Sequence, residues 1–201
     1  MTTADAQGPP RSLPPTPSQT IGPFYGYALP FRGGEEIAPP GHPGTVTVHG
    51  YVLDGDGRPV PDALVELWGA GLDGTVAQVD GSIRRDPATG DQLGRTGVEF
   101  TGWGRAPTDA GGHWYARTLR PGARGRGAPY LSLCVFARGL LVHLFTRVYL
   151  PGDEAALAAD PLLARVGDRR GTLIAADEGR GTYRFDIRLQ GDGETVFLEF
   201  R

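Results

Sequence analysis

The chain has 201 residues, of which 39% are hydrophobic, and its formal net charge is -3. A chain of this length and composition can bury one sizeable core, so we expect a single domain. The slightly acidic balance argues against nucleic acid as a partner. No apolar run reaches the ~18 residues that a membrane span needs, and no basic-then-apolar leader opens the chain, so we expect a cytoplasmic protein without membrane contact.

The first 44 residues are expected to form an arm and loop that contact a partner, ahead of a domain at 45–201. Residues 1–16 hold prolines and small polar residues with little to bury, which favours a mobile segment. Residues 16–25 then combine two prolines, a glycine and two aromatic rings. This composition favours a fixed extended path, with the rings docked either on the arm's own domain or on a partner.

Period-two patterns and turn residues predict an all-β domain. The two stretches 45–52 and 63–68 flank the turn at Asp54–Gly57 and suggest a hairpin-like pair. A calcium loop there lacks the bidentate glutamate that an EF-hand requires. The remaining expected strands are 113–119, the two halves of 128–150, 183–189 and 195–200. About seven short strands with little helix indicate a β-sandwich.

Two other stretches differ from this pattern. Residues 80–97 read as a long polar loop, which is uncommon in a compact domain unless it is functional or lies at an interface. Residues 154–159 are rich in alanine, and Asp160-Pro161 reads as the cap and first residue of a second short helix.

The most apolar stretch, 128–150, predicts two central strands that meet at Arg138-Gly139. Its only charged residues are Arg138 and Arg147. An arginine among core strands needs a carboxylate, backbone carbonyls, a partner chain or an anionic ligand, and a structural ion pair is the simplest of these. Cys134 is the only cysteine of the chain, so we expect a buried, unreactive thiol.

Six motifs occur in an order that resembles the intradiol ring-cleaving dioxygenases. They are T-P-S-Q-T-I-G-P-F-Y (16–25), G-Y-V-L-D-G-D-G-R-P-V-P-D-A-L-V-E-L-W (50–68), G-W-G-R with T-D-A-G-G (102–112), A-R-G-L-L-V-H-L-F-T-R-V-Y-L (137–150), R-R-G-T-L-I-A (169–175) and L-Q-G-D-G-E-T-V-F-L-E-F (189–200). The resemblance implies a prealbumin-like β-sandwich. It is strongest to the alpha chains of the members that act on protocatechuate, which pair with a homologous beta chain and assemble further into larger particles.

Catalytic chains of this family hold one ferric ion with two tyrosines and two histidines, a ligand set suited to Fe(III). The motifs place other residues at these four positions, namely Val76, Arg124, Tyr130 and Ser132. The histidines at 42, 49, 113 and 143 show no chelating spacing. The resemblance therefore implies that this chain holds no metal and no catalytic residue, and that the partner beta chain holds the iron.

In the family, the alpha chain's arm and one arginine reach the beta chain's site. The matching pocket residues here are Thr20, Gly22, Pro23, Phe24 and Arg138. Arg138 would pair with the carboxylate on the substrate ring and orient the diol. Some relatives have a tyrosine where this chain has Phe24, so that hydroxyl is absent.

The resemblance thus implies an alpha subunit, inactive alone, that takes part in O2-dependent cleavage of protocatechuate to 3-carboxy-cis,cis-muconate in the beta-ketoadipate pathway of aromatic catabolism. An alternative is a non-enzymatic prealbumin-like carrier or assembly module, since sandwiches host many functions. A self-sufficient dioxygenase would need a metal constellation that the sequence does not show.

Overall fold

The computed structural model describes residues 22, 24–77, 83–95, 99–125 and 127–200. The expected mobile segment 1–16 and residues 17–21 and 23 of the arm motif, which include the predicted pocket residues Thr20 and Pro23, lie outside this part of the chain. The elements run in the order α1 (Tyr25–Ala28), β1 (Thr45–Leu53), β2 (Leu64–Gly69), β3 (Ile83–Arg85), β4 (Gln92–Arg95), β5 (Trp103–Pro107), β6 (His113–Leu119), β7 (Tyr130–Phe136), β8 (Leu144–Tyr149), α2 (Glu154–Ala159), α3 (Pro161–Val166), the 3-10 helix η1 (Gly167–Leu173), β9 (Ala176–Gly179), β10 (Thr182–Arg184) and β11 (Ile187–Arg188).

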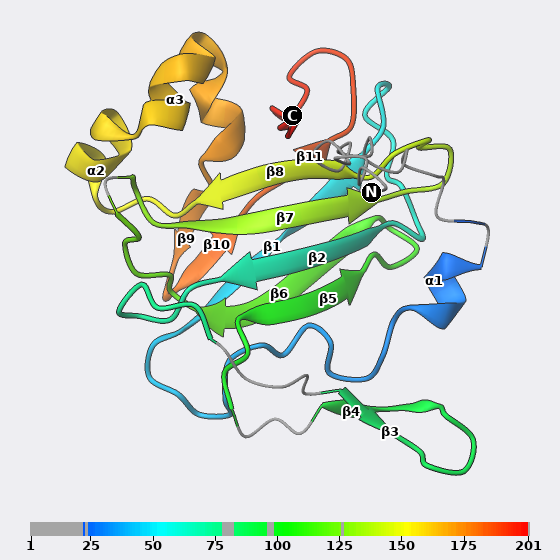
Figure 1. Cartoon of the computed structure of the whole chain (residues 1–201). Helices are drawn as coiled ribbons and strands as arrows, with labels where there is room; N and C mark the ends of the chain where they lie inside the picture. Colours follow the sequence, from blue (N-terminus) through cyan, green and yellow to red (C-terminus); the bar gives the residue numbers. More distant parts are fainter. Residues whose placement is uncertain (1–21, 23, 78–82, 96–98, 126, 201) are drawn as a thin grey trace, which may run out of the picture.

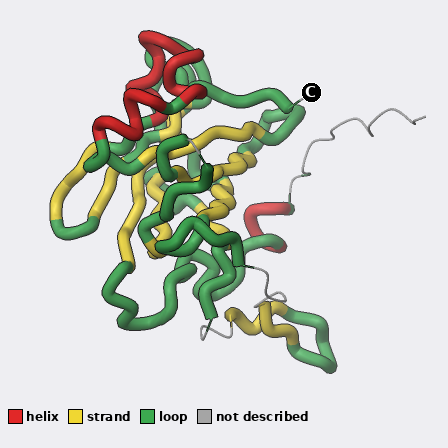
Figure 2. The backbone as a smooth tube through the Cα atoms, turned by 60° about the vertical axis from the view of Figure 1, so that its left-hand side comes forward, coloured by secondary structure: helices red, strands yellow, loops and turns green. Residues whose placement is uncertain are grey.

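Two β-sheets form the body of the molecule, which confirms the expected sandwich (Figure 1). One sheet has β1 at its centre, with β6 along one edge and β10, β11 and then β9 on the other side. The second sheet has the order β5-β2-β7-β8. Figure 2 shows helices α2 and α3 at one end of this body, and the β3–β4 hairpin projecting at the other.

The core lies between the two sheets, where alternate side chains of each strand point inward. Buried and half-buried residues alternate along the whole of β1. The inward side chains that are fully buried include Val48, Val52, Val65, Leu67, Trp114, Leu131, Leu133, Val135, Val148 and Ile187. These side chains come from both sheets and form the larger of two apolar clusters.

The expected hairpin between 45–52 and 63–68 is wrong, because β1 and β2 belong to different sheets. The chain stays beside β1 only briefly, through a bond from the Val60 amide to the Val52 carbonyl of 2.8 Å. Pro61 cannot donate to a ladder, and Asp62 then takes the left-handed conformation with φ of 63°. These two residues redirect the chain into the second sheet.

The expected strand 183–189 is divided into β10 and β11, which pair in sequence with β1. Gly50 of β1 lies so close to the Phe185 carbonyl that a side chain at Gly50 would collide with it. The Tyr51 amide donates to the Asp186 side chain at 3.1 Å in place of a ladder bond. The close approach of Gly50 to Phe185 therefore interrupts the expected strand, although polar and apolar residues alternate along 183–189.

The expected strand 195–200 is wrong, since this segment makes only an isolated bridge between Leu198 and Phe145 of β8. The expectation that both halves of 128–150 are central holds for β7 but not for β8, which is the last strand of its sheet.

The expected loop 80–97 contains the β3–β4 hairpin. The turn of this hairpin is fixed by the Asp86 carboxylate, which accepts from the Ala88 amide at 2.7 Å.

Both expected helical pieces are confirmed. The Asp160 side chain accepts from the amides of Leu162 and Leu163 at 2.9 and 3.0 Å, and Pro161 occupies the first turn. The helices bury Leu157 and Leu163 against Tyr149 in a second, smaller apolar cluster. Within the described residues, none of the helices is long and apolar enough to cross a membrane.

Candidate functional site

Strand β7 crosses the sandwich from one end to the other (Figure 1), and the predicted site residues of 128–150 lie on it or in the turn that follows it. We call the first the ligand-position end, defined by Val76, Arg124, Tyr130 and Ser132. We call the second the arginine end, defined by Tyr25, Asp62 and Arg138. Strand β7 begins at the ligand-position end, and the turn after it carries Arg138.

The structure places the segments that carry the four ligand positions beside one another. Tyr130 and Ser132 are two residues apart on β7, so they share its outward face, opposite the buried Leu131 and Leu133. Val76 and Arg124 follow two loops that contact each other, because the Gly122 amide donates to the Gly71 carbonyl at 2.9 Å. The pairing of Gly69 with Leu131 sets the first of these loops beside the start of β7.

These four residues do not fit a ferric ion. The Val76 side chain has no donor atom, and Arg124 carries a positive charge. The Arg147 guanidinium lies 3.8 Å from the centre of the Tyr130 ring. This cation–π contact places a fixed positive charge beside the single phenol of the set. The chemistry of these side chains therefore opposes a metal at the ligand-position end.

The same arginine is tied into a buried network. Arg147 donates to the Tyr149 hydroxyl at 3.3 Å, and that hydroxyl donates to Asp160 at 3.1 Å. Asp160 also accepts from the Ala128 amide at 3.0 Å. Burial raises the pKa of Tyr149 to about 12, so its hydroxyl is neutral at physiological pH. Arg147 is thus satisfied by a ring and a hydroxyl rather than by the ion pair expected from sequence.

The histidines all have structural neighbours. The Nδ1 of His49 and the Nε2 of His113 are 3.1 Å apart, and the other ring nitrogen of His49 lies 2.8 Å from Glu178. The Nδ1 of His42 accepts from a backbone amide, and His143 packs on an aromatic ring. Across the described part of the chain, no three His, Cys, Asp or Glu side chains converge as a metal site would require.

Arg138 does not lie among core strands as expected. It occupies the turn after β7, and its side chain is 75% exposed. Its guanidinium forms an ion pair with Asp62, a residue that the sequence analysis includes only as part of the motif 50–68. Cys134 agrees with expectation: it is buried, and burial raises the pKa of its thiol to about 12.

The arm reaches the arginine end through α1. The Tyr25 ring is buried, and its hydroxyl has a raised pKa because of burial and the nearby Asp62 charge. Tyr25 opens the short helix α1 and its ring packs on the arm's own domain, one of the two expected alternatives. Most of the expected extended path, at 16–21 and 23, lies outside the described residues. Phe24, beside it in the chain, is 74% exposed. Tyr25, rather than the predicted Gly22 or Phe24, is the arm-motif residue that lines a cavity together with Arg138.

Two cavities share Asp62 and Arg138 as lining residues. The larger, of about 560 Å³, also touches Leu140, Leu189 and Gln190. The smaller, of about 190 Å³, lies against α1 and touches Tyr25. Arg138 therefore stands between the arm and an open pocket.

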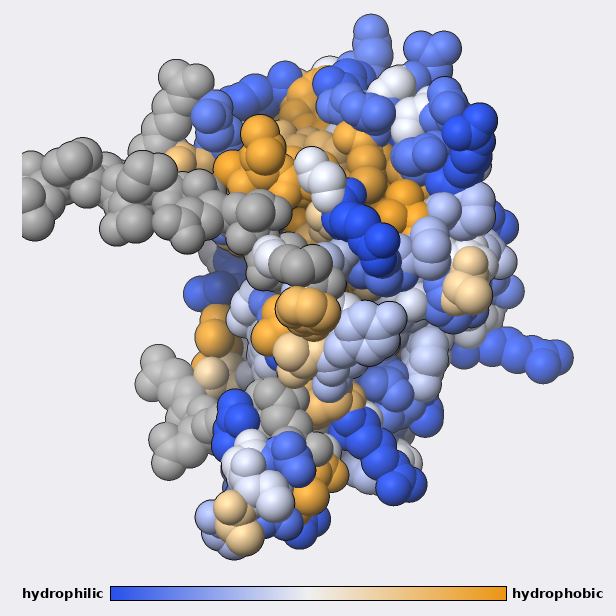
Figure 3. Space-filling model, turned by 90° about the vertical axis from the view of Figure 1, so that its right-hand side faces the viewer, coloured by the Kyte–Doolittle hydropathy of each residue, from blue (hydrophilic) through white to orange (hydrophobic). Residues whose placement is uncertain are grey.

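An apolar surface lies beside the arginine end. It consists of Leu141, Val142, Phe145 and Phe200, of which Leu141 is 78% and Phe200 70% exposed. Figure 3 views this side of the molecule and shows apolar side chains gathered in its upper half. Exposed apolar side chains gathered on one face mark contact surfaces.

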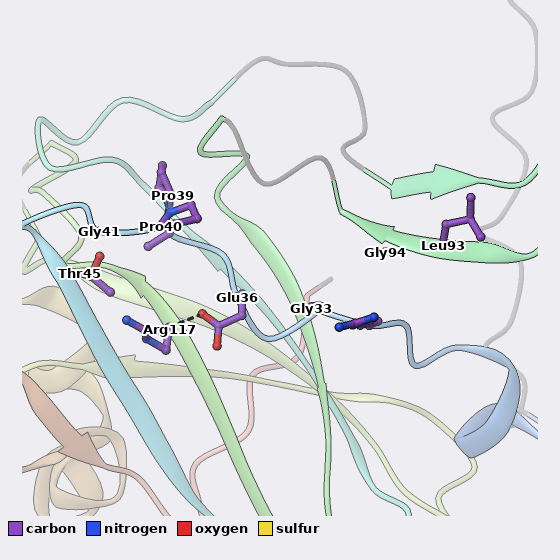
Figure 4. Close-up of a pocket in the computed structure, with 11 residues that line it drawn as sticks. Gly33, Glu36, Pro39, Pro40, Gly41, Thr45, Leu93, Gly94 and Arg117 are labelled. Atoms are coloured by element: carbon purple, nitrogen blue, oxygen red, sulfur yellow. Dashed lines mark hydrogen bonds and ion pairs between the residues drawn. The ribbon is translucent and has the colours of Figure 1, made fainter.

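A further pocket, of about 520 Å³, was not anticipated from sequence (Figure 4). It lies between the segment 32–45 and β4, and Leu93 forms part of its wall. Arg117 and Glu36 line it as an exposed ion pair with a distance of 3.4 Å. None of the predicted substrate-pocket or ligand-position residues lines it, but Leu93 and Gly94 belong to the stretch 80–97 that was singled out from sequence.

Comparison with known proteins agrees with this fold. The family described as Dioxygenase matches residues 22–191. The chain is 40% identical to the protocatechuate 3,4-dioxygenase alpha chain of Burkholderia cepacia, over 94% of this chain and 98% of the relative. It is 31% identical to the beta chain from the same organism, over 83% and 78%.

Among solved structures, the dioxygenase domain of a carbohydrate-binding fusion protein from Streptomyces sp. SirexAA-E superposes with a TM-score of 0.54. The two are 24% identical, and the match covers 89% of this chain and 99% of that domain. This likeness concerns the fold alone. The family match and the identity to the Burkholderia cepacia alpha chain show that the chain belongs to the intradiol ring-cleaving dioxygenase family.

Proposed function

We propose that this chain is the alpha subunit of a cytoplasmic protocatechuate 3,4-dioxygenase. Bound to a homologous beta chain, it takes part in the O2-dependent cleavage of protocatechuate to 3-carboxy-cis,cis-muconate in the beta-ketoadipate pathway. The alpha–beta units assemble further into a larger oligomer. Identity to an alpha chain over nearly the full length of both proteins supports this assignment over a non-enzymatic carrier.

One observation supports the assignment of iron binding to the beta chain rather than to this chain. The fold of the family is complete here, yet Val76, Arg124, Tyr130 and Ser132 stand at the ligand positions, with Arg147 packed over Tyr130. An active complex therefore needs a second chain with a complete ligand set. We assign the ferric ion to the beta chain, where it supplies the Lewis acidity and redox chemistry of ring cleavage.

In this proposal Arg138 binds the carboxylate of the substrate. Its pairing with Asp62 uses one terminal nitrogen, Nη2, and the structure shows no partner for its Nε and Nη1 among the described residues. A guanidinium can receive a carboxylate through two parallel hydrogen bonds, which fixes the ring in one orientation. When the beta chain covers this end, the surroundings lose water and the pairing becomes stronger.

We assign residues 1–44 to partner contact and residues 45–201 to the sandwich domain. Tyr25 anchors the arm on its own domain, and the exposed Phe24 leaves one ring available to the beta chain. Thr20, Gly22, Pro23 and Phe24 would form one wall of the substrate pocket. The apolar surface beside Arg138 would bury against the same partner, as the large apolar interfaces of permanent complexes do.

Metal analysis and oxygen-uptake measurements test the assignment of the iron to the beta chain. The singly expressed chain should contain no stoichiometric iron and consume no O2 with protocatechuate. The same chain co-expressed with a beta chain that retains two tyrosines and two histidines should contain iron and be active. Tightly bound iron with a tyrosinate-to-iron absorption band in the isolated alpha chain would contradict the proposal.

A further inference from the structure

Asp62 occupies an unusual backbone position at the arginine end. Its φ of 63° places it in the left-handed region, which aspartate and asparagine adopt more readily than most residues. Pro61 precedes it, and β2 begins two residues later. The turn is therefore tightly determined, and the carboxylate it carries is presented to Arg138.

The ion pair leaves much of the arginine available. Arg138 is 75% exposed, whereas the Asp62 side chain is 30% exposed, so the carboxylate is the better-held partner. Contact is made through Nη2 of the guanidinium. Because the guanidinium is planar, fixing one nitrogen limits the directions in which Nε and Nη1 point. Both residues line the 560 Å³ cavity.

Asp62 also contacts the arm. A methyl group at Gly26 of α1 would lie 3.6 Å from the Asp62 Cβ, which is ordinary van der Waals contact. The Tyr25 hydroxyl lies near the Asp62 carboxylate and the Arg138 backbone. One carboxylate thus adjoins both elements that the proposed pocket takes from this chain.

We propose that Asp62 is a positioning residue for substrate recognition: it orients the Arg138 guanidinium toward the cavity and fixes α1 beside it. This inference rests on the proposed function, since it gives Asp62 a role only if Arg138 binds a carboxylated catechol. The opposite role, in which Asp62 competes with the substrate for Arg138, is disfavoured. Asp62 contacts only Nη2, so the Nε and Nη1 donors can bind a second carboxylate without displacing the first.

The test is steady-state kinetics of the co-expressed alpha–beta complex carrying Asp62→Asn. Asparagine tolerates the same backbone conformation and keeps the size of the side chain, but it removes the charge that holds the guanidinium. We expect kcat/KM for protocatechuate to fall about 3- to 10-fold, mainly through KM, with the value for unsubstituted catechol little changed. The melting temperature of the complex should stay close to that of the parent.

Two further variants make the outcome decisive. Glu194→Gln removes the carboxylate from the exposed Arg169–Glu194 pair, which lines a different pocket of the sandwich domain, and should leave both substrates unaffected. Arg138→Ala tests the proposed function itself. In the Arg138→Ala background, Asp62→Asn should have no further effect on the protocatechuate-to-catechol ratio, because the two residues act on one step.

Each other result has a defined meaning. If Arg138→Ala does not lower the ratio, the proposed role of Arg138 fails. If Arg138→Ala lowers it but Asp62→Asn does not, only the positioning role fails. A rise in kcat/KM with Asp62→Asn would show that Asp62 competes with the substrate. An equal loss for both substrates together with a lower melting temperature would show a purely structural residue, and either result overturns the inference.

Discussion

The two ends of the β7–β8 pair carry arginines in contrasting surroundings. At the ligand-position end, Arg147 is half-buried, stacked on Tyr130 and bonded to Tyr149, which in turn donates to Asp160. At the arginine end, Arg138 is exposed and meets its partner Asp62 through one nitrogen. A half-buried charge packed between a ring and a hydroxyl stabilises a fold, whereas an exposed charge held at one point can still bind a ligand. The difference favours the arginine end as the part of this chain that takes part in catalysis.

Deletion of the arm should have the largest effect of all the variants, and it should act at the arginine end alone. Deletion of residues 1–26 removes the arm motif and the buried Tyr25 while leaving the ligand-position end untouched. We expect heterodimer assembly to weaken by at least about tenfold, since permanent interfaces depend on such apolar anchors. Gel filtration of the co-expressed chains measures this. An intact and fully active complex from the deletion would show that the arm is not an interface element.

Arg138→Ala should have the next largest effect, confined to substrates with a carboxylate. Loss of hydrogen bonds to a charged group typically costs about 1.5–3 kcal/mol, so kcat/KM for protocatechuate should fall about 10- to 150-fold. Activity toward catechol should change far less. The measurement is steady-state kinetics of the complex with both substrates at equal folded concentration.

Arg117→Ala is the matched control for that variant. Arg117 is also an exposed arginine paired with one carboxylate, Glu36, but it lines the pocket beside β4. We expect the protocatechuate-to-catechol ratio to stay at the parental value. A similar loss in both variants would mean that removal of any surface arginine affects the ratio, and the special role of Arg138 would be abandoned.

Arg147→Met should affect stability rather than selectivity. It removes the cation–π contact with Tyr130 and the bond to Tyr149, together worth about 2 kcal/mol in a partly desolvated site. Methionine keeps most of the apolar stem in place. Thermal unfolding of the complex should show a lower midpoint, while the ratio of the two substrates stays constant. A changed ratio would assign a substrate role to the ligand-position end.

Much of the difference between the ligand-position end and the arginine end can be predicted from the sequence, because it depends on local patterns. The alternation of Leu131, Leu133 and Val135 predicts β7, and the Asp160-Pro161 pair predicts the start of α3. The resemblance to the family supplies the ligand positions and Arg138. These features are set within a few residues along the chain, where period and capping are reliable guides.

What the sequence does not predict depends on contacts between distant segments. Strand β2, which follows Asp62, pairs with β5 and β7 rather than with β1, because the turn at Asp62 directs it into the second sheet. The division of 183–189 depends on how closely Gly50 approaches Phe185. The Asp62–Arg138 pair joins residues 76 positions apart, and neither residue alone signals the other.

The smallest predicted effect concerns the pH dependence of the ligand-position end. Burial raises the pKa of Tyr149 from its ordinary value of 10 to about 12. Between these two values the folded chain keeps the phenol proton that the unfolded chain loses, so stability falls as the pH rises through this window. At about pH 11 this loss amounts to about 1.4 kcal/mol, one pH unit above the unfolded value.

Tyr149→Phe should remove the loss of stability that this hydroxyl causes between about pH 10 and pH 12, without changing the contributions of other groups to the pH dependence. Asp160 loses one donor but keeps its bonds from Ala128, Leu162 and Leu163, so the helix cap survives and the cost near neutral pH should be small. Thermal unfolding at neutral and alkaline pH, together with ultraviolet titration of the tyrosines, measures both quantities. If parent and variant lose stability equally between about pH 10 and pH 12, the Tyr149 hydroxyl is not held neutral by burial, and the network around Arg147 is open to water.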